Sequence, residues 1–140
     1  MKTLKINLIL IFLSVMMIGN ASNFKAEIIY FDIAKAEIKE SQKEKLEKLS
    51  KASQVYLIGH TDSDGDLEYN QSLSKKRVNA VLDFLISNDI SKSKIEVEYF
   101  GEEKPLNENL DNNQKSENRR VEIRYISDPL LDYEVQSQIF

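Results

Sequence analysis

Within residues 27–126, segments whose apolar residues have the spacing of a β-strand are interspersed with segments that have the spacing of an α-helix. Short apolar or alternating runs predict strands over residues 27–31, 55–58, 94–100 and 120–126. Helix-like spacing falls between the first and second strands and again between the second and third. The order β-α-β-α-β-β predicts an α+β two-layer sandwich, with two main helices on one face of a four-strand mixed sheet.

The two main helices differ in length and in how they are expected to begin. In the first, Leu46, Leu49 and Ala52 form a narrow apolar stripe, and Ser41 with Glu44 predicts a capping-box start. The second is longer and is predicted to run from residues 67–69 to residues 87–89. We also expect a short helix over residues 112–117, before the last strand.

The first 21 residues have the layout of a secretory signal peptide. Two lysines precede an apolar run from Leu8 to Ile18, and small residues follow at Gly19 and Ala21. The run is much shorter than the roughly 20 residues of a membrane-spanning helix. The domains expected are thus a signal peptide (1–21), a folded domain (22–126) and a C-terminal tail (127–140). An uncleaved membrane anchor is the alternative.

Cleavage of this segment has a direct test. If residues 1–21 are removed on export, mass spectrometry of the exported protein will show a chain that begins at Ser22. An intact Met1 on membrane-associated material would contradict the signal-peptide interpretation.

Composition excludes several classes of function. The formal net charge is −4, whereas nucleic acid requires a basic face, so we expect no nucleic-acid partner. The chain has no cysteine, and therefore we expect neither disulfides nor a lipid anchor on a cysteine. With one histidine and no cysteine, no metal site or cofactor is predicted.

Two oppositely charged residues carry the main chemical hypothesis. Asp62 follows the second strand in Gly59-His60-Thr61-Asp62, and Arg77 lies about two turns into the long helix. Together they can hold a zwitterion, because Asp62 suits an ammonium group and the planar guanidinium of Arg77 suits a carboxylate. An internal Asp62–Arg77 ion pair that ties the loop to the helix is the alternative.

Five ordered blocks resemble the OmpA-like C-terminal domain family. They contain Tyr30-Phe31-Asp32, Gly59-His60-Thr61-Asp62, Asn70 through Arg77, Phe100-Gly101-Glu102-Glu103-Lys104-Pro105 and Asn118-Arg119-Arg120. The resemblance spans residues 28–126 and is strongest to the peptidoglycan-associated lipoprotein branch, although the lipobox cysteine is absent. It implies non-covalent binding of the peptide stem of peptidoglycan at its diaminopimelate, with Asp62 on the ammonium and Arg77 on the carboxylate.

Four further residues are candidates for the same site. Thr61 offers a hydroxyl beside Asp62, the amide of Asn70 can reach a peptide or cap the helix, and Leu73 supplies apolar wall. Arg119 matches a family position on the carboxylate side, although a structural salt bridge is an equally good interpretation. Where the family often carries Asp or Asn, this chain has Ala34, so a side-chain contact is lost.

Metal and enzyme interpretations fit the sequence poorly. The acidic turn of Asp62, Asp64 and Asp66 has Leu67 and Leu73 where a calcium loop needs Gly and Glu. His60 lies on the same turn as its would-be triad partners, whereas a fold brings triad members together from separate segments. We therefore expect no enzyme activity.

The sequence therefore predicts a non-catalytic periplasmic module that binds diaminopimelate-type peptidoglycan beneath the outer membrane, with another envelope protein as a further possible partner. The alternative is an envelope structural or interaction protein that keeps the fold but no longer binds peptidoglycan.

Overall fold

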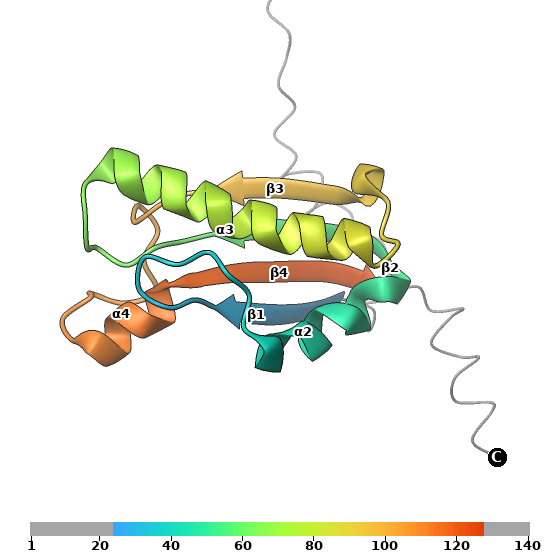
Figure 1. Cartoon of the computed structure of the whole chain (residues 1–140), viewed down its shortest axis with the longest axis horizontal. Coiled ribbons are helices and arrows are strands. Elements are labelled where there is room, and N and C mark those ends of the chain that lie inside the picture. Colours follow the sequence, from blue (N-terminus) through green and yellow to red (C-terminus); the bar gives the residue numbers. More distant parts are fainter. Residues whose placement is uncertain (1–23, 128–140) are drawn as a thin grey trace, which may run out of the picture.

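The computed structural model describes residues 24–127, which form a mixed four-strand sheet with helices on one side (Figure 1). The expected signal peptide and the tail beyond Ser127 lie outside the described residues. In chain order the elements are β1 (Phe24–Tyr30), α2 (Glu40–Glu47), η2 (Lys48–Lys51), β2 (Ala52–Gly59), α3 (Leu67–Ser87), η3 (Lys92–Lys94), β3 (Ile95–Tyr99), α4 (Asn112–Asn118) and β4 (Arg120–Ser127).

The sheet has the strand order β1-β4-β2-β3. β4 pairs antiparallel with both β1 and β2, while β2 and β3 are parallel. A parallel pair needs a crossover connection, and α3 provides it between β2 and β3. The α+β class, the mixed sheet and the two main helices are therefore confirmed, and the short third helix is α4.

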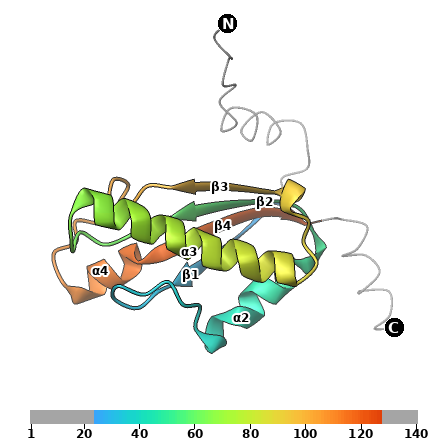
Figure 2. The same cartoon turned by 45° about the horizontal axis from the view of Figure 1, so that its top comes forward.

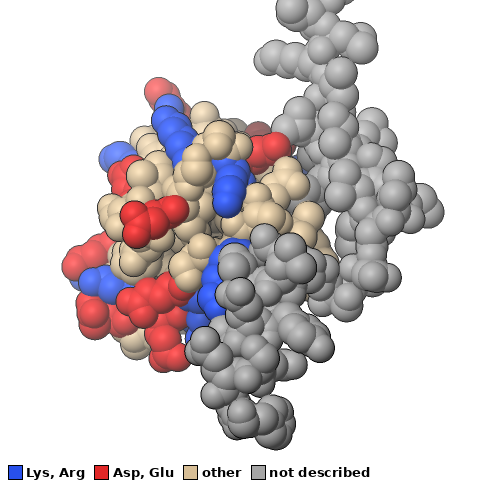
Figure 3. All heavy atoms as spheres, turned by 90° about the vertical axis from the view of Figure 1, so that its right-hand side faces the viewer, with Lys and Arg blue, Asp and Glu red and all other residues tan. Residues whose placement is uncertain are grey.

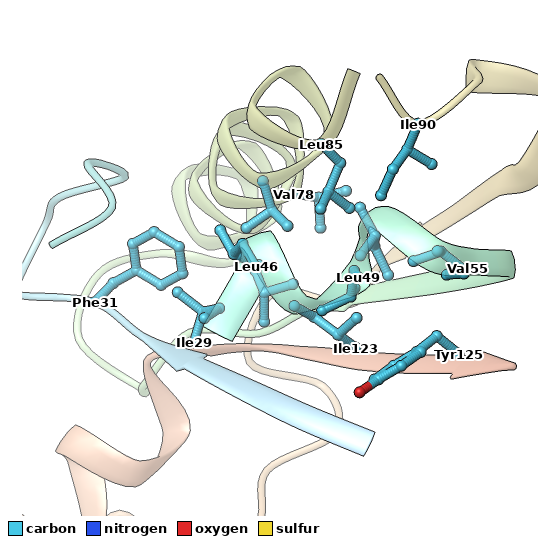
Figure 4. Close-up of a cluster of buried hydrophobic side chains, with 14 residues drawn as sticks. Ile29, Phe31, Leu46, Leu49, Val55, Val78, Leu85, Ile90, Ile123 and Tyr125 are labelled. Atoms are coloured by element: carbon cyan, nitrogen blue, oxygen red, sulfur yellow. The ribbon is translucent and has the colours of Figure 1, made fainter. Parts of the chain in front are cut away.

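The hydrophobic core lies between the sheet and the two main helices. Figure 4 shows Leu46 and Leu49 from the α2 segment and Val78 and Leu85 from α3 directed at apolar side chains of the strands. Alternation along each strand directs every second residue to this side, as the alternating patterns of the last two strands indicated. The residues that complete the core from the sheet include Ile29, Val55, Leu57, Val121, Ile123 and Tyr125.

The first helix begins differently from the prediction. It starts at Glu40 rather than at a cap on Ser41, and its N-cap Lys39 makes no side-chain cap hydrogen bond. Instead, the amide of Gln42 exchanges two hydrogen bonds of 2.7 Å with the backbone N–H and C=O of Tyr30. This contact on the edge strand outweighs the local capping signal, so the capping-box prediction was wrong.

The helical stripe also ends earlier than predicted. Ala52 was expected to continue it, but it is the first residue of β2. Only Leu46 and Leu49 of the stripe reach the core from the helical segment. Among residues 24–127, no helix combines the length and hydropathy that crossing a membrane requires.

The first and last described residues, Phe24 and Ser127, lie at the same end of the sheet. Phe24 pairs with Ile126 at that end, and Tyr30 pairs with Arg120 at the other. Figures 1 and 2 show the start of α3 and all of α4 at the Tyr30 end. Figure 3 looks at the opposite end, where basic and acidic side chains are interspersed on the visible described surface. The candidate residues gather at the Tyr30 end.

Candidate functional site

Backbone hydrogen bonds place the acidic turn at the end of β2. The N–H of His60 donates to the carbonyl of Arg120 at 2.9 Å, and the N–H of Thr61 donates to the carbonyl of Gly101 at 2.8 Å. The segment is therefore held on one side by β4 and on the other by the loop after β3. Asp62 follows directly, and its side chain has little freedom to move away from these neighbours.

A glycine allows α3 to approach β2 closely at this point. A Cβ on Gly59 would lie 2.6 Å from the carbonyl oxygen of Ser74 and from Cγ2 of Val78. Any larger residue would push the helix away from the strand. This close approach brings Arg77, on the same stretch of α3, to the backbone of His60.

Asp62 is buried and already has a basic partner. One carboxylate oxygen accepts a hydrogen bond from the N–H of Asp64 at 3.2 Å, and the other lies 2.9 Å from Nη1 of Arg119. Only 5% of Asp62 is exposed. Asp62 therefore forms an internal ion pair, but its partner is Arg119 and not Arg77 as the alternative interpretation supposed.

Arg77 is wholly buried, and backbone carbonyls occupy much of its guanidinium. Its Nε donates to Lys35 at 2.9 Å, Nη1 to His60 at 3.0 Å, and Nη2 to Asp32 at 3.2 Å. The ring of Phe31 lies 5.3 Å from the guanidinium carbon. Because a guanidinium has five N–H groups, two remain beyond these three bonds.

Burial lowers the pKa of Arg77 to about 10, although the negative charge of Asp62 opposes this shift. The side chain therefore remains charged at neutral pH. A buried cation that is bonded to three carbonyls joins the segments that carry them. In this chain those segments are the loop after β1 and the end of β2.

The loop after β1 contains an unusual backbone conformation. Ala34 has φ 57°, in the left-handed region that non-glycine residues rarely adopt and that Asn and Asp tolerate best. Arg77 binds the carbonyls of Asp32 and Lys35, which flank this residue. Ala34 holds this conformation without the local hydrogen bond that an Asp or Asn side chain could add.

Two buried polar groups at the acidic turn have no hydrogen-bond partner among the described residues. They are the hydroxyl of Thr61 and the amide oxygen Oδ1 of Asn70, and both residues are fully buried. A buried polar atom without a partner costs about 1–3 kcal/mol, so each such group calls for an explanation, and a bound ligand is one. Leu73, also buried, lies one turn after Asn70 on α3.

The three acids of the turn have separate partners. While Asp62 pairs with Arg119, Asp64 lies 2.6 Å from the ammonium of Lys115, and Asp66 caps α3 by accepting from the N–H of Tyr69 at 2.8 Å. Within residues 24–127, no group of three acidic or histidine side chains is placed to hold a metal ion.

His60 lies beneath the site on the open side of the sheet. Its ring is buried, and Nε2 is 3.6 Å from the carboxylate of Glu122. Burial, together with the positive charge of Arg120, lowers the pKa of His60 to about 4. The imidazole is therefore neutral at neutral pH and forms no ion pair with Glu122 there.

The structure thus brings Thr61, Asp62, Asn70, Arg77 and Arg119 to one end of the fold. Sequence reasoning missed two contributors. The first is the pair of carbonyls on the loop after β1, which no side-chain motif could reveal. The second is Glu102, whose carboxylate accepts from Nδ2 of Asn70; its place in the Phe100-Gly101-Glu102 block was the only available signal.

Comparison with known proteins identifies the family. Residues 30–119 match the model of the OmpA family, and the chain belongs to this family. It is 38% identical over 72 residues to the peptidoglycan-associated lipoprotein of Pseudomonas putida, covering 51% of this chain and 43% of that protein. It is 33% identical over 112 residues to outer membrane protein A of Citrobacter freundii, covering 68% of this chain and 47% of that one.

Solved structures agree with this assignment. The peptidoglycan-associated lipoprotein of Burkholderia pseudomallei matches with a TM-score of 0.67 and 26% identity, over 70% of this chain and 88% of that one. The C-terminal domain of Helicobacter pylori MotB has a TM-score of 0.65 at 19% identity, over 79% and 92% of the two chains, and shares the fold. The chain spans less than half the length of the two curated relatives named above.

Proposed function

We propose that this chain is a non-catalytic module that binds peptidoglycan in the periplasm, beneath the outer membrane. The ligand is the peptide stem, held at its diaminopimelate by a clamp of Asp62 and Arg77. Membership of the OmpA family and the likeness to proteins named as peptidoglycan-associated support this proposal. The observation that carries it is the pair of unpartnered buried groups, on Thr61 and Asn70, at the turn that contains the buried Asp62.

Binding would proceed by exchange of one cation for another. In the free protein, Arg119 neutralises Asp62 at 2.9 Å. An ammonium group of the ligand would take over this contact, which leaves Arg119 available to a carboxylate of the same ligand. Because Asp62 is paired in both states, the exchange avoids the desolvation of a lone buried charge.

Arg77 would contribute in two ways. Its two remaining N–H groups can donate to the ligand's carboxylate, and its three carbonyl bonds hold the loop after β1 as a wall of the site. Ile33, on the loop after β1, and Leu67, the first residue of α3, expose apolar surface on which a peptide can pack. No bond is made or broken in this scheme, and no cofactor takes part.

The alternative is an envelope interaction protein that keeps the fold without binding peptidoglycan. One observation favours it, since the Asp62–Arg119 pair already satisfies the central carboxylate. The unpartnered groups on Thr61 and Asn70 favour the ligand-binding proposal, because polar atoms of a ligand could supply their missing bonds.

We expect Asp62→Asn to lower binding to purified sacculi by at least about tenfold, because an amide keeps the shape of the carboxylate but loses its charge. The measurement is co-sedimentation of the protein with sacculi over a range of protein concentrations. Asp83→Asn, at an exposed position on the same α3 helix, is the matched control and should bind normally.

Circular dichroism of each variant confirms that the fold is retained before binding is compared. Sacculus binding that is absent in the native protein, or equal in Asp62→Asn, would favour the envelope interaction protein instead.

A further inference from the structure

Only one of the two polar atoms of the Asn70 side-chain amide has a hydrogen-bond partner. Its Nδ2 donates to the carboxylate of Glu102, whereas its Oδ1 is buried without a partner. That oxygen faces the acidic turn, since a Cβ on Gly65 would lie 3.6 Å from it. The orientation of this one amide therefore decides whether the turn faces a donor or an acceptor.

The chemistry of Glu102 fixes that orientation. A carboxylate can only accept hydrogen bonds, so the amide group that faces it must be the NH₂. If the amide were flipped, two acceptors would be in contact and the NH₂ would face the turn. With Glu102 in place, Asn70 presents an oxygen to the acidic turn, next to Gly65.

The backbone around Glu102 keeps it in position. The preceding Gly101 has φ 55°, its N–H donates to the hydroxyl of Ser74 at 3.0 Å, and its carbonyl accepts from Thr61. Nε2 of Gln71 binds the carbonyl of Tyr99 at 3.0 Å. The start of this loop is thus bonded both to α3 and to the segment that carries Asp62.

We infer that Glu102 is a positioning residue that sets the ligand selectivity of the site, by directing the amide oxygen of Asn70 at the ammonium group of the ligand. This inference rests on the proposed peptidoglycan binding. Asp62 supplies the charge, and Asn70 supplies a second acceptor for the same ammonium. Two acceptors on one cation favour a free amine over an acylated one, because acylation removes both the charge and most of the donors.

The test compares two ligands in one protein. The first is a disaccharide tripeptide that ends in diaminopimelate with its side-chain amine free, and the second is the same muropeptide with that amine acetylated. Affinities are measured by calorimetric titration, with competition against the free-amine form for the weaker ligand. We expect Glu102→Leu to bind the free-amine form about tenfold more weakly and the acetylated form with unchanged affinity.

Two further variants separate positioning from simple damage. Glu102→Gln keeps an acceptor for Asn70 and should lose no more than about threefold in affinity. Glu103→Leu removes a neighbouring exposed carboxylate and should behave as the native protein does. In nuclear magnetic resonance spectra, the side-chain NH₂ signals of Asn70 should shift in Glu102→Leu and stay in place in Glu103→Leu.

The outcomes are distinct for the inference and for the function. If the native protein binds neither muropeptide, the proposed function fails and the inference fails with it. If the native protein binds the free-amine form but Glu102→Leu weakens both ligands equally, or neither, peptidoglycan binding stands and the role of Glu102 in selectivity is refuted.

Discussion

Replacing Arg77 with lysine is expected to lower the free energy of unfolding by about 3 kcal/mol and to abolish sacculus binding nearly as completely as Arg77→Ala. The guanidinium bonds three carbonyls that belong to two separate segments. An ammonium keeps the charge but cannot reach all three from one point. The bond to the carbonyl of His60 is buried, and leaving that carbonyl without a donor costs about 1–3 kcal/mol.

Urea denaturation gives the stability, and co-sedimentation with sacculi at a temperature where the variant is folded gives the binding. Lys76→Ala changes the exposed neighbour of Arg77 and should alter stability by less than about 0.5 kcal/mol. A lysine variant with native stability would mean that the three carbonyl bonds contribute little. Native binding by a folded lysine variant would remove Arg77 from the proposed clamp.

The helix that carries Arg77 could be predicted from the sequence, whereas the hydrogen-bond partners of Arg77 could not. The sequence predicted that Arg77 lies in a long second helix, and α3 spans the predicted range. The backbone carbonyls that bind Arg77 could not be predicted from the sequence. A side-chain motif indicates which charges are present, but the direction of a backbone carbonyl depends on loop conformation.

The ion-pair partner of Asp62 also could not be predicted from the sequence. Arg77 and Arg119 both come from family blocks, and spacing along the chain cannot tell which of them reaches the carboxylate. The carbonyls of Asp32, Lys35 and His60 engage Arg77, and Arg119 is left to neutralise Asp62. The competition among acceptors is settled by the packed structure.

The sequence pattern mispredicted the start of the first helix. Ser41 and Glu44 satisfy the spacing of a capping box, yet the N-cap is Lys39, two residues before Ser41, and Gln42 bonds the backbone of Tyr30. A side chain that covers an exposed strand edge satisfies two backbone groups at once. Tertiary contacts of this kind set element boundaries, whereas the order of the elements was already evident from periodicity.

The choice of ligand gives the sharpest test of the clamp. We expect the domain to bind lysine-type muropeptides at least about tenfold more weakly than diaminopimelate-type ones. Lysine at the same stem position presents an amine without the neighbouring carboxylate. Asp62 could still hold that amine, but Arg119 would lose its acidic partner to the exchange, and the free N–H groups of Arg77 would find no carboxylate.

Calorimetric titration of both muropeptides in one buffer measures this preference directly. A matched variant tells which arginine is responsible. Arg119→Gln should reduce the preference if Arg119 binds the carboxylate after the exchange, and should leave it intact if Arg77 alone does so. Equal affinities of the native domain for the two muropeptides would show that neither arginine recognises the carboxylate, and the Asp62–Arg77 clamp would then have to be abandoned even if sacculus binding persisted.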